Sequence, residues 1–311
     1  MQVFLFLCLL LFNIIMANDS SQNELNNLID FDANLLHEDL IHIKNELIET
    51  AKLNGVKSFV VPGSGLVDSE QALELSSEYN TKGYEGLIAA TCGVHPYHVN
   101  DVACNELSKL KLKALVSNDL CHAVGEAGLD YSDGFPVDEE QHDWFKYQIS
   151  LALECKKPLF LHERAAHEDF ISILDSYGFK KNKNDDTNNP VDAIVHCFTG
   201  NVDELETYID RDYYIGLTGH VIHRLEQEEL KSWMRKIPID RLLFETDAPY
   251  MGFKGCRRTE LKKKGSRYPN VPASLSQVVH HVASVAGIPS TTLAAAAFKN
   301  AARLFPRAKF M

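Results

Sequence analysis

The sequence predicts an α/β protein that forms a TIM-type (β/α)8 barrel, and three observations support this prediction. Short apolar runs alternate with longer amphipathic stretches along most of the 311 residues. There are eight such runs, and eight repeats favour a closed barrel of parallel strands over an open sheet. Acidic and imidazole side chains stand where four of the runs end, which is where barrel enzymes place their active sites. An open, doubly wound sheet is the alternative, but no glycine-rich dinucleotide turn follows the first run.

The candidate strands and helices follow one another in a regular order. The apolar runs cover residues 28–34, 56–61, 87–94, 122–128, 158–162, 193–198, 213–217 and 242–246. Helical patterns lie between them, for example at residues 139–154, 166–177 and 203–211, and an alanine-rich segment at 289–305 predicts a terminal helix packed on the barrel. Because no low-complexity linker interrupts this order, we expect a single barrel domain.

An apolar segment at residues 3–16 precedes the first candidate strand. It is too short for a comfortable membrane span, so no stable membrane insertion is expected, and it is typical of a signal-peptide core within residues 1–17. Ala17 supplies a small residue at the cleavage point. These features predict a secreted protein, whereas a true start at Met16 would leave the protein in the cytoplasm.

The overall charge and the cysteines restrict the function classes. The net charge of −12 argues against broad, nonspecific coating of nucleic acid, although it allows a local basic patch. Apart from Cys8 the chain has six cysteines, and their spacing matches neither a disulfide framework nor a zinc knot. With 45% apolar residues the chain can build a sizeable core.

Four side chains with metal-ligand chemistry occupy equivalent places. Glu126 ends the run in HAVGEAGLD, His162 ends PLFLHER, His196 ends DAIVHCFTG and Asp247 ends LLFETDAPY. A single histidine at a strand end is usually a hydrogen-bonded structural group, but four such residues in one register are hard to attribute to chance. In a closed barrel they would converge at the mouth and hold a divalent ion, which activates water and stabilises charge on a phosphoryl oxygen. Oxygen and imidazole ligands favour Mg²⁺ or Mn²⁺, with Zn²⁺ as the alternative.

These and other motifs together resemble the TatD family of metal-dependent deoxyribonucleases, over about residues 28–306. The motifs occur in family order and are GVHP (93–96), GEAGLDY (125–131), EEQ (139–141), LHER (161–164), HCFTG (196–200), YIGLTG (214–219) and ETDAPY (245–250). The resemblance implies an amidohydrolase-type barrel with 3′-to-5′ exonuclease or broader DNase activity. It also implies that Glu126, His162, His196 and Asp247 are metal ligands. Glu245 matches the acid beside the last ligand, and His95 matches a polar residue of the substrate cleft.

The chain departs from the family pattern in two places. Many members carry His-x-His on the first strand, where this chain has Asp32 and Asn34. Residues i and i+2 on a strand point the same way, so both can reach the mouth, and Asp32 is a candidate ligand of a second ion. The alternative for Asp32 is a purely hydrogen-bonding role, which leaves the number of ions at one or two. Asn-Val-Pro at 270–272 stands where many members have Asn-Glu-Pro.

The segment after the last strand, at residues 251–269, is strongly basic. Its candidate DNA-backbone contacts are Lys254, Arg257, Lys262, Lys263 and Lys264. On a barrel this segment overhangs the mouth, where phosphate-binding loops are common. A charge run is otherwise most often a solvated surface. Tyr97, Phe253 and Tyr268 are aromatic candidates for base stacking, with core packing as the alternative for each.

We therefore predict a metal-dependent deoxyribonuclease with DNA as its substrate and 3′-to-5′ exonuclease activity. Asp247 would act as the proton acceptor, and Glu126 would act beside it as a catalytic and metal-binding carboxylate. A barrel hydrolase of a small ester, amide or lactone is one alternative, and it would not need the basic segment. A secreted DNA-binding protein with a decayed site is the other, but retention of the other four ligands argues against decay.

Overall fold

The computed structural model describes residues 25–135, 139–180, 190–257 and 269–311. The predicted signal peptide at 1–17 and the basic residues Lys262, Lys263 and Lys264 lie outside these ranges. So does Tyr268.

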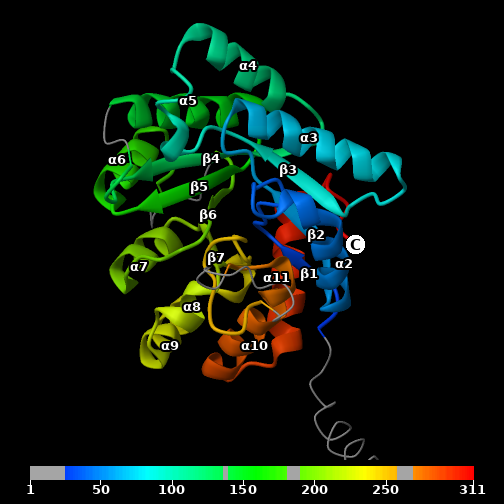
Figure 1. Cartoon of the computed structure of the whole chain (residues 1–311). Helices are drawn as coiled ribbons and strands as arrows, with labels where there is room; N and C mark the ends of the chain where they lie inside the picture. The colour runs from blue at the N-terminus through cyan, green and yellow to red at the C-terminus, as the bar shows by residue number, and fades with distance from the viewer. Residues whose placement is uncertain (1–24, 136–138, 181–189, 258–268) are drawn as a thin grey trace, which may run out of the picture.

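Eight parallel strands form one sheet in the order β1 to β8, which confirms the predicted barrel (Figure 1). The strands are β1 (Leu28–Asp30), β2 (Val56–Val61), β3 (Ile88–Cys92), β4 (Cys121–Asp130), β5 (Leu159–Arg164), β6 (Ala193–Val195), β7 (Tyr214–Leu217) and β8 (Leu242–Phe244). The Phe31 amide donates to the Phe244 carbonyl at 3.1 Å, and an isolated parallel bridge joins Ala33 to Ala248. These contacts close the barrel between its first and last strands.

Helices lie between most of the strands and surround them. They are α2 (Lys44–Leu53), α3 (Leu66–Thr81), α4 (Glu106–Val116), α5 (Glu139–Cys155), α6 (His167–Ser176), α7 (Val202–Asp210), α8 (His220–His223), α9 (Gln227–Lys236), α10 (Leu275–Ala286) and α11 (Ser290–Leu304). Some begin at a side-chain cap that the sequence encodes. Asn201 and Glu204 form a capping box at the start of α7 and satisfy backbone amides that the helix cannot.

β6 and β8 end earlier than predicted, where side chains take the place of sheet hydrogen bonds. β2 matches its prediction, whereas β8 ends at Phe244. The Glu245 amide still donates to the Leu217 carbonyl of β7 at 3.1 Å, but the Thr246 amide donates to the Asp30 carboxylate at 2.7 Å. β6 ends before His196, since the following Cys197 has a positive φ of 46° and its amide donates to the Glu245 carboxylate. Both of these departures lie at the carboxyl ends of the strands.

Two of the proposed ligands lie inside their strands, which corrects the prediction that they end them. His162 is followed by two further residues of β5, and Glu126 lies near the middle of β4. The register between β4 and β5 shifts between Val124 and Ala127, so the bulge presents Glu126 at the mouth although the strand continues. Gly125 has a φ of 148°, and a Cβ there would approach the Phe160 carbonyl oxygen to 2.0 Å. Only glycine therefore fits this position of the bulge.

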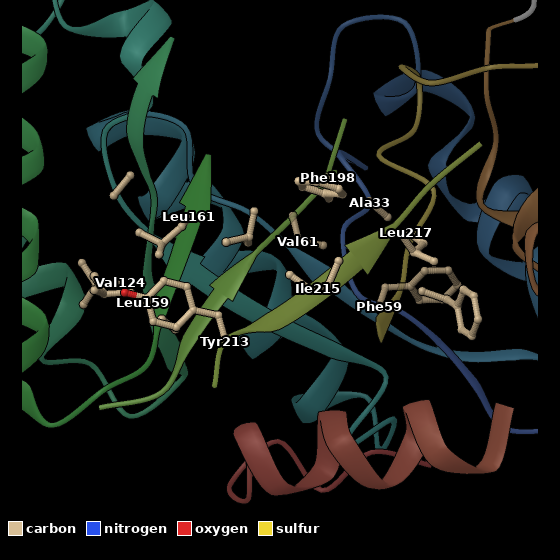
Figure 2. Close-up of a cluster of buried hydrophobic side chains, with 14 of the residues drawn as sticks. Ala33, Phe59, Val61, Val124, Leu159, Leu161, Phe198, Tyr213, Ile215 and Leu217 are labelled. Atoms are coloured by element: carbon tan, nitrogen blue, oxygen red, sulfur yellow. The ribbon is translucent and has the colours of Figure 1, made fainter. Parts of the chain in front are cut away.

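Alternate residues of each strand face two different parts of the core. One set belongs to the buried cluster that also contains the apolar side chains of the helices, and Figure 2 labels Phe59 and Val61, Leu159 and Leu161, and Ile215 and Leu217 among its members. The other set fills the barrel interior and includes Val60, Ala89, Phe160, Ile194, Tyr214 and Leu243.

The terminal helix α11 and the residues after it close one end of the barrel. Ala301, Leu304, Phe305 and Ala308 belong to the same buried cluster as the inner face of the strands. The Phe305 ring lies 5.0 Å from the Phe31 ring, centroid to centroid. The predicted packing of residues 289–305 on the barrel is confirmed. The packing leaves the opposite end of the barrel, at the strand carboxyl ends, for the site.

Among the described residues no single helix has both the length and the apolar character needed to cross a membrane. The segments Pro272–Ala286 and Ser290–Leu304 meet those criteria only as a pair bent by 117°.

We expect Phe305→Ala to lower the free energy of unfolding by about 3–5 kcal/mol, because it opens a cavity where the ring is now 1% exposed. Chemical denaturation followed by circular dichroism measures the change. Leu107→Ala, at a residue 78% exposed, is the control and should change stability by about 0.5 kcal/mol or less. Equal effects of the two substitutions would show that α11 does not seal the barrel.

Candidate metal centre

Two groups of three side chains meet at the carboxyl ends of the strands. His95, Glu126 and His162 form the first group, which we call triad A; their ligand atoms lie within 4.8 Å of one another. Asp32, His196 and Glu245 form the second, triad B, within the same distance. The six residues lie on or just after six strands of the barrel, so its closure brings together residues up to about two hundred positions apart.

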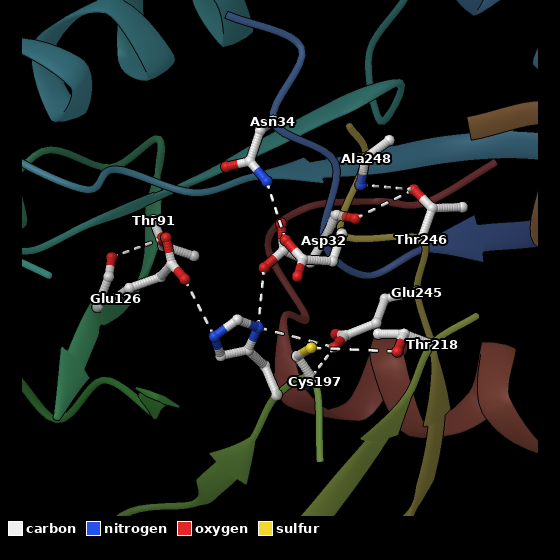
Figure 3. Close-up of polar contacts among 12 residues, drawn as sticks. Asp32, Asn34, Thr91, Glu126, Cys197, Thr218, Glu245, Thr246 and Ala248 are labelled. Carbon is white, nitrogen blue, oxygen red and sulfur yellow. Dashed lines mark hydrogen bonds and ion pairs between the residues drawn. The ribbon is translucent and has the colours of Figure 1, made fainter. Parts of the chain in front are cut away.

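His196 joins the two triads. Its Nδ1 lies 3.0 Å from Asp32 Oδ2 and 3.7 Å from Glu245 Oε1, and its Nε2 lies 3.0 Å from Glu126 Oε1 (Figure 3). The ring also stacks on Phe160, with centroids 4.9 Å apart. The imidazole is thus held between carboxylates on both of its edges.

Most of the buried polar atoms of triad B lack a hydrogen-bond partner among the described residues. Both oxygens of Asp32, both ring nitrogens of His196 and one oxygen of Glu245 are shielded from solvent and make no hydrogen bond of good geometry with a described residue. The contacts of His196 with the carboxylates are therefore ion pairs without aligned donors. Buried carboxylates normally receive hydrogen bonds or coordinate a cation, because an unpaired buried charge is costly. This set of side chains fits a divalent cation.

His162 is oriented by a carboxylate behind it. Its Nε2 lies 2.9 Å from Asp130 Oδ2, and Asp130 in turn accepts a hydrogen bond from the Ser132 amide at 2.9 Å. A proton on Nε2 leaves the lone pair of Nδ1 available. A carboxylate that holds a histidine in this way is a common feature of metal sites.

Burial keeps the histidines of triad A neutral. It lowers the pKa of His95 to about 3, and His162 adds to this effect. Burial also lowers the pKa of His162 to about 4, although Asp130 opposes the shift. Near neutral pH a proton therefore does not compete with a metal for either ring.

In triad B and at Asp247 the pKa values are instead raised. Burial opposes charge on His196, but Asp32, Glu126 and Glu245 outweigh it, so the pKa of His196 is raised well above its usual value. Burial raises the pKa of Asp32 well above its usual range and that of Asp247 to about 7. Without a metal this half of the site holds protons.

Asp247 stands beside the triads on a constrained backbone. Its φ is 53°, a conformation that non-glycine residues seldom adopt and that is frequent at functional sites. Asn34 Nδ2 donates to Asp247 Oδ1 at 3.1 Å, so the residue that replaces the second histidine of the family pattern fixes this carboxylate.

The preceding residue, Thr246, is held from two sides. The Asp30 carboxylate accepts from the Thr246 amide and, at 2.6 Å, from its hydroxyl. The Asn270 side-chain amide donates to the Thr246 carbonyl at 2.7 Å. Asn270 belongs to the Asn-Val-Pro segment, so it positions the last strand although the acid of the family pattern is absent.

The structure brings most of the predicted site residues together. Asp32, Glu126, His162 and His196 meet in the two triads, His95 joins triad A rather than only lining a cleft, and Asp247 adjoins them. Lys254 is exposed and Arg257 half-buried on the segment after β8. Of the aromatic candidates, Tyr97 is 52% exposed, whereas Phe253 is buried in the core and cannot stack on a base.

Sequence reasoning gave no role to Asp30 or Asp130. Asp130 lies four residues after Glu126 on one strand, so both face the same side, and this spacing was the available signal. Asp30 acts on a residue 216 positions away, and no local pattern reveals such a contact.

Comparison with known proteins gives one family. The TatD related DNase family matches residues 29–306. The 3′-5′ ssDNA/RNA exonuclease TatD of Erwinia tasmaniensis is 33% identical over 278 residues, which cover 89% of this chain and 99% of that protein. The protein of the same name from Cronobacter sakazakii is 34% identical, with 89% and 97% covered. The crystal structure of the TatD homologue YJJV from Escherichia coli has a TM-score of 0.75 at 24% identity, covering 90% of this chain and 98% of that one, and so shares the fold.

We expect metal affinity to rise between about pH 6 and about pH 8, and binding to release protons. Below its pKa Asp247 is a neutral acid, and His196 carries a proton that blocks a ring nitrogen, so a cation must displace both protons. Calorimetric titration with Mn²⁺ in buffers of different ionisation enthalpy measures the release. Asp247→Asn should release fewer protons. A pH-independent affinity would contradict the assignment.

Proposed function

We propose that this chain, which belongs to the TatD related DNase family, is a metal-dependent deoxyribonuclease with 3′-to-5′ exonuclease activity. The observation that supports the proposal most directly is that Asp32, His196 and Glu245 of triad B have buried polar atoms without a hydrogen-bond partner among the described residues. The relatives from Erwinia and Cronobacter are named as exonucleases of single-stranded DNA and RNA, and we propose single-stranded DNA as the substrate here.

We propose that each triad holds one divalent ion. Triad A offers two neutral imidazoles and one carboxylate, and triad B offers two carboxylates and one imidazole. This mixture of oxygen and nitrogen ligands favours Mg²⁺ or Mn²⁺, with Zn²⁺ as the alternative. Bound at this site, divalent ions would polarise the phosphoryl oxygens and increase the acidity of a coordinated water.

The residues of this chain then supply position and proton transfer. Once a divalent ion has displaced its proton, the Asp247 carboxylate is suited to accept the proton of the water that attacks phosphorus. Asn34 orients this carboxylate, and Asp130 orients His162. Tyr97 and Tyr250, each 52% exposed, offer aromatic surfaces to an unstacked base.

We also propose that residues 1–17 direct the chain into the secretory pathway, which would make extracellular DNA its substrate. The support is the apolar segment at residues 3–16. Sequencing the amino terminus of the mature protein tests this part separately from the enzymatic activity.

We expect the full-length protein to shorten single-stranded DNA from its 3′ end in Mg²⁺ or Mn²⁺ and to lose this activity in EDTA. A 5′-labelled oligonucleotide should give a ladder of products, whereas a 3′-labelled one should release the label as a mononucleotide. Small esters and lactones, assayed alongside, should be poor substrates. Full activity after thorough removal of metal would refute the mechanism.

We expect Asp247→Asn to reduce turnover by about 100-fold or more, because the amide cannot accept a proton.

His162→Ala and His196→Ala should abolish activity, and Asp32→Ala should reduce the bound Mn²⁺ from two ions to one, as counted by metal analysis. His280→Ala on α10, outside both triads, is the matched control. A folded Asp32→Ala variant with unchanged metal content would show that Asp32 does not bind a metal and has only a hydrogen-bonding role.

A further inference from the structure

A positively charged cavity of about 810 Å³ lies beside the two triads. Arg164, which ends β5, lines it together with His220, His223 and Arg224 from α8 and the residue after it, and Met251 from the segment after β8. No acidic side chain occurs among the described residues that line it. In a chain with 43 acidic and 31 basic residues, a cavity of this composition is a local exception.

The cavity belongs to the same mouth as the metal centre. Arg164 follows His162 by two residues, and Thr199, another lining residue, follows His196 by three. Loops after strands β5 to β8 therefore form both the cavity and one side of the triads. Arg164 is close enough to His162 and His220 to disfavour protonation of either ring.

The two arginines are not needed to neutralise acids of the fold. Arg164 is held through its backbone, whose carbonyl accepts from the Tyr131 amide at 3.0 Å. Neither its guanidinium nor that of Arg224 forms an ion pair with a described residue. Guanidinium groups that face a cavity without a carboxylate partner suit a phosphate, which they bind through paired N–H donors.

We propose that this cavity binds the phosphodiester on the 5′ side of the bond that is cleaved, through Arg164 and Arg224. The proposal rests on the exonuclease function proposed above. When the scissile phosphate occupies the triads, the 3′ side carries only the terminal nucleoside, so a further phosphate exists only upstream. A cavity of this size accommodates one nucleotide with its phosphate. The DNA on the 5′ side of the cleaved bond thus runs from the metal centre across β5 and α8.

Dinucleotides test this assignment because one terminal phosphate can be added or omitted. A dinucleoside monophosphate presents only the scissile phosphate, whereas its 5′-phosphorylated form also presents the upstream one. The ratio of kcat/KM for the two substrates measures recognition of that phosphate within each variant. We expect the wild type to prefer the 5′-phosphorylated form by about tenfold or more, as a charge-assisted contact implies.

Arg164→Gln and Arg224→Gln should each bring this ratio close to one, since they remove the charge and keep most of the side-chain length. Lys299→Gln removes the same charge from the exposed surface of α11, at the other end of the barrel, and should retain the wild-type ratio. Circular dichroism confirms that each variant is folded. A wild-type ratio near one, or arginine variants that keep the wild-type ratio, would overturn the proposal.

A binding measurement separates the failure of this proposal from that of the exonuclease function. Both dinucleotides are prepared with an uncleavable methylene phosphonate in place of the internal phosphate and titrated calorimetrically in Mg²⁺. Tighter binding of the 5′-phosphorylated form, lost in the arginine variants, supports the cavity assignment even if the wild type degrades no DNA. Equal binding of both forms to the wild type overturns it even if the enzyme is an active nuclease.

Discussion

The hydrogen bonds between the Asp30 carboxylate and Thr246 join the first and last strands of the barrel and determine the geometry of the site. Both oxygens of Asp30 are used, one by the Thr246 amide and one by its hydroxyl. A carboxylate in this position is fully buried, and burial raises its pKa well above the usual range. The protein therefore retains an acid that is costly to bury where it connects two strand ends. Asp32 and Asp247, which follow these strands, are also joined directly, because the Asp247 amide donates to the Asp32 carbonyl at 2.9 Å.

The charge distribution at the mouth follows from the same closure. Triad A presents neutral imidazoles, whereas triad B gathers carboxylates around one imidazole whose pKa they raise. Such a cluster would repel itself and lose hydration if it remained empty of cations. The arginine cavity beside it has the opposite sign and would draw a polyanion toward the acidic centre. In this way a strongly acidic protein could direct a nucleic acid to its metal centre.

Much of the fold was predictable because its signals are local. Alternating apolar runs and helical patterns located the eight strands, and β2 was predicted to the residue. The site was predictable as far as ligand-type residues recur near strand ends. The position of Glu126 inside β4 was not predictable, since it depends on a bulge and on contact between Gly125 and the neighbouring strand. Asp30 and the arginine cavity depend on contacts between segments far apart in the chain, which no window of sequence contains.

The last helix has a consequence for the order of synthesis. Ala301, Leu304 and Phe305 fill the floor of the barrel, and the Met311 amide donates to the Ser58 hydroxyl at 3.2 Å. The free edge of strand β1 stays uncovered until β8 has been synthesised. A nascent chain on the ribosome consequently exposes the edge of β1 until β8 emerges, and an apolar floor until residues 301–308 emerge. A chain that lacks α11 would leave the barrel floor uncovered and become a target for chaperones and proteases.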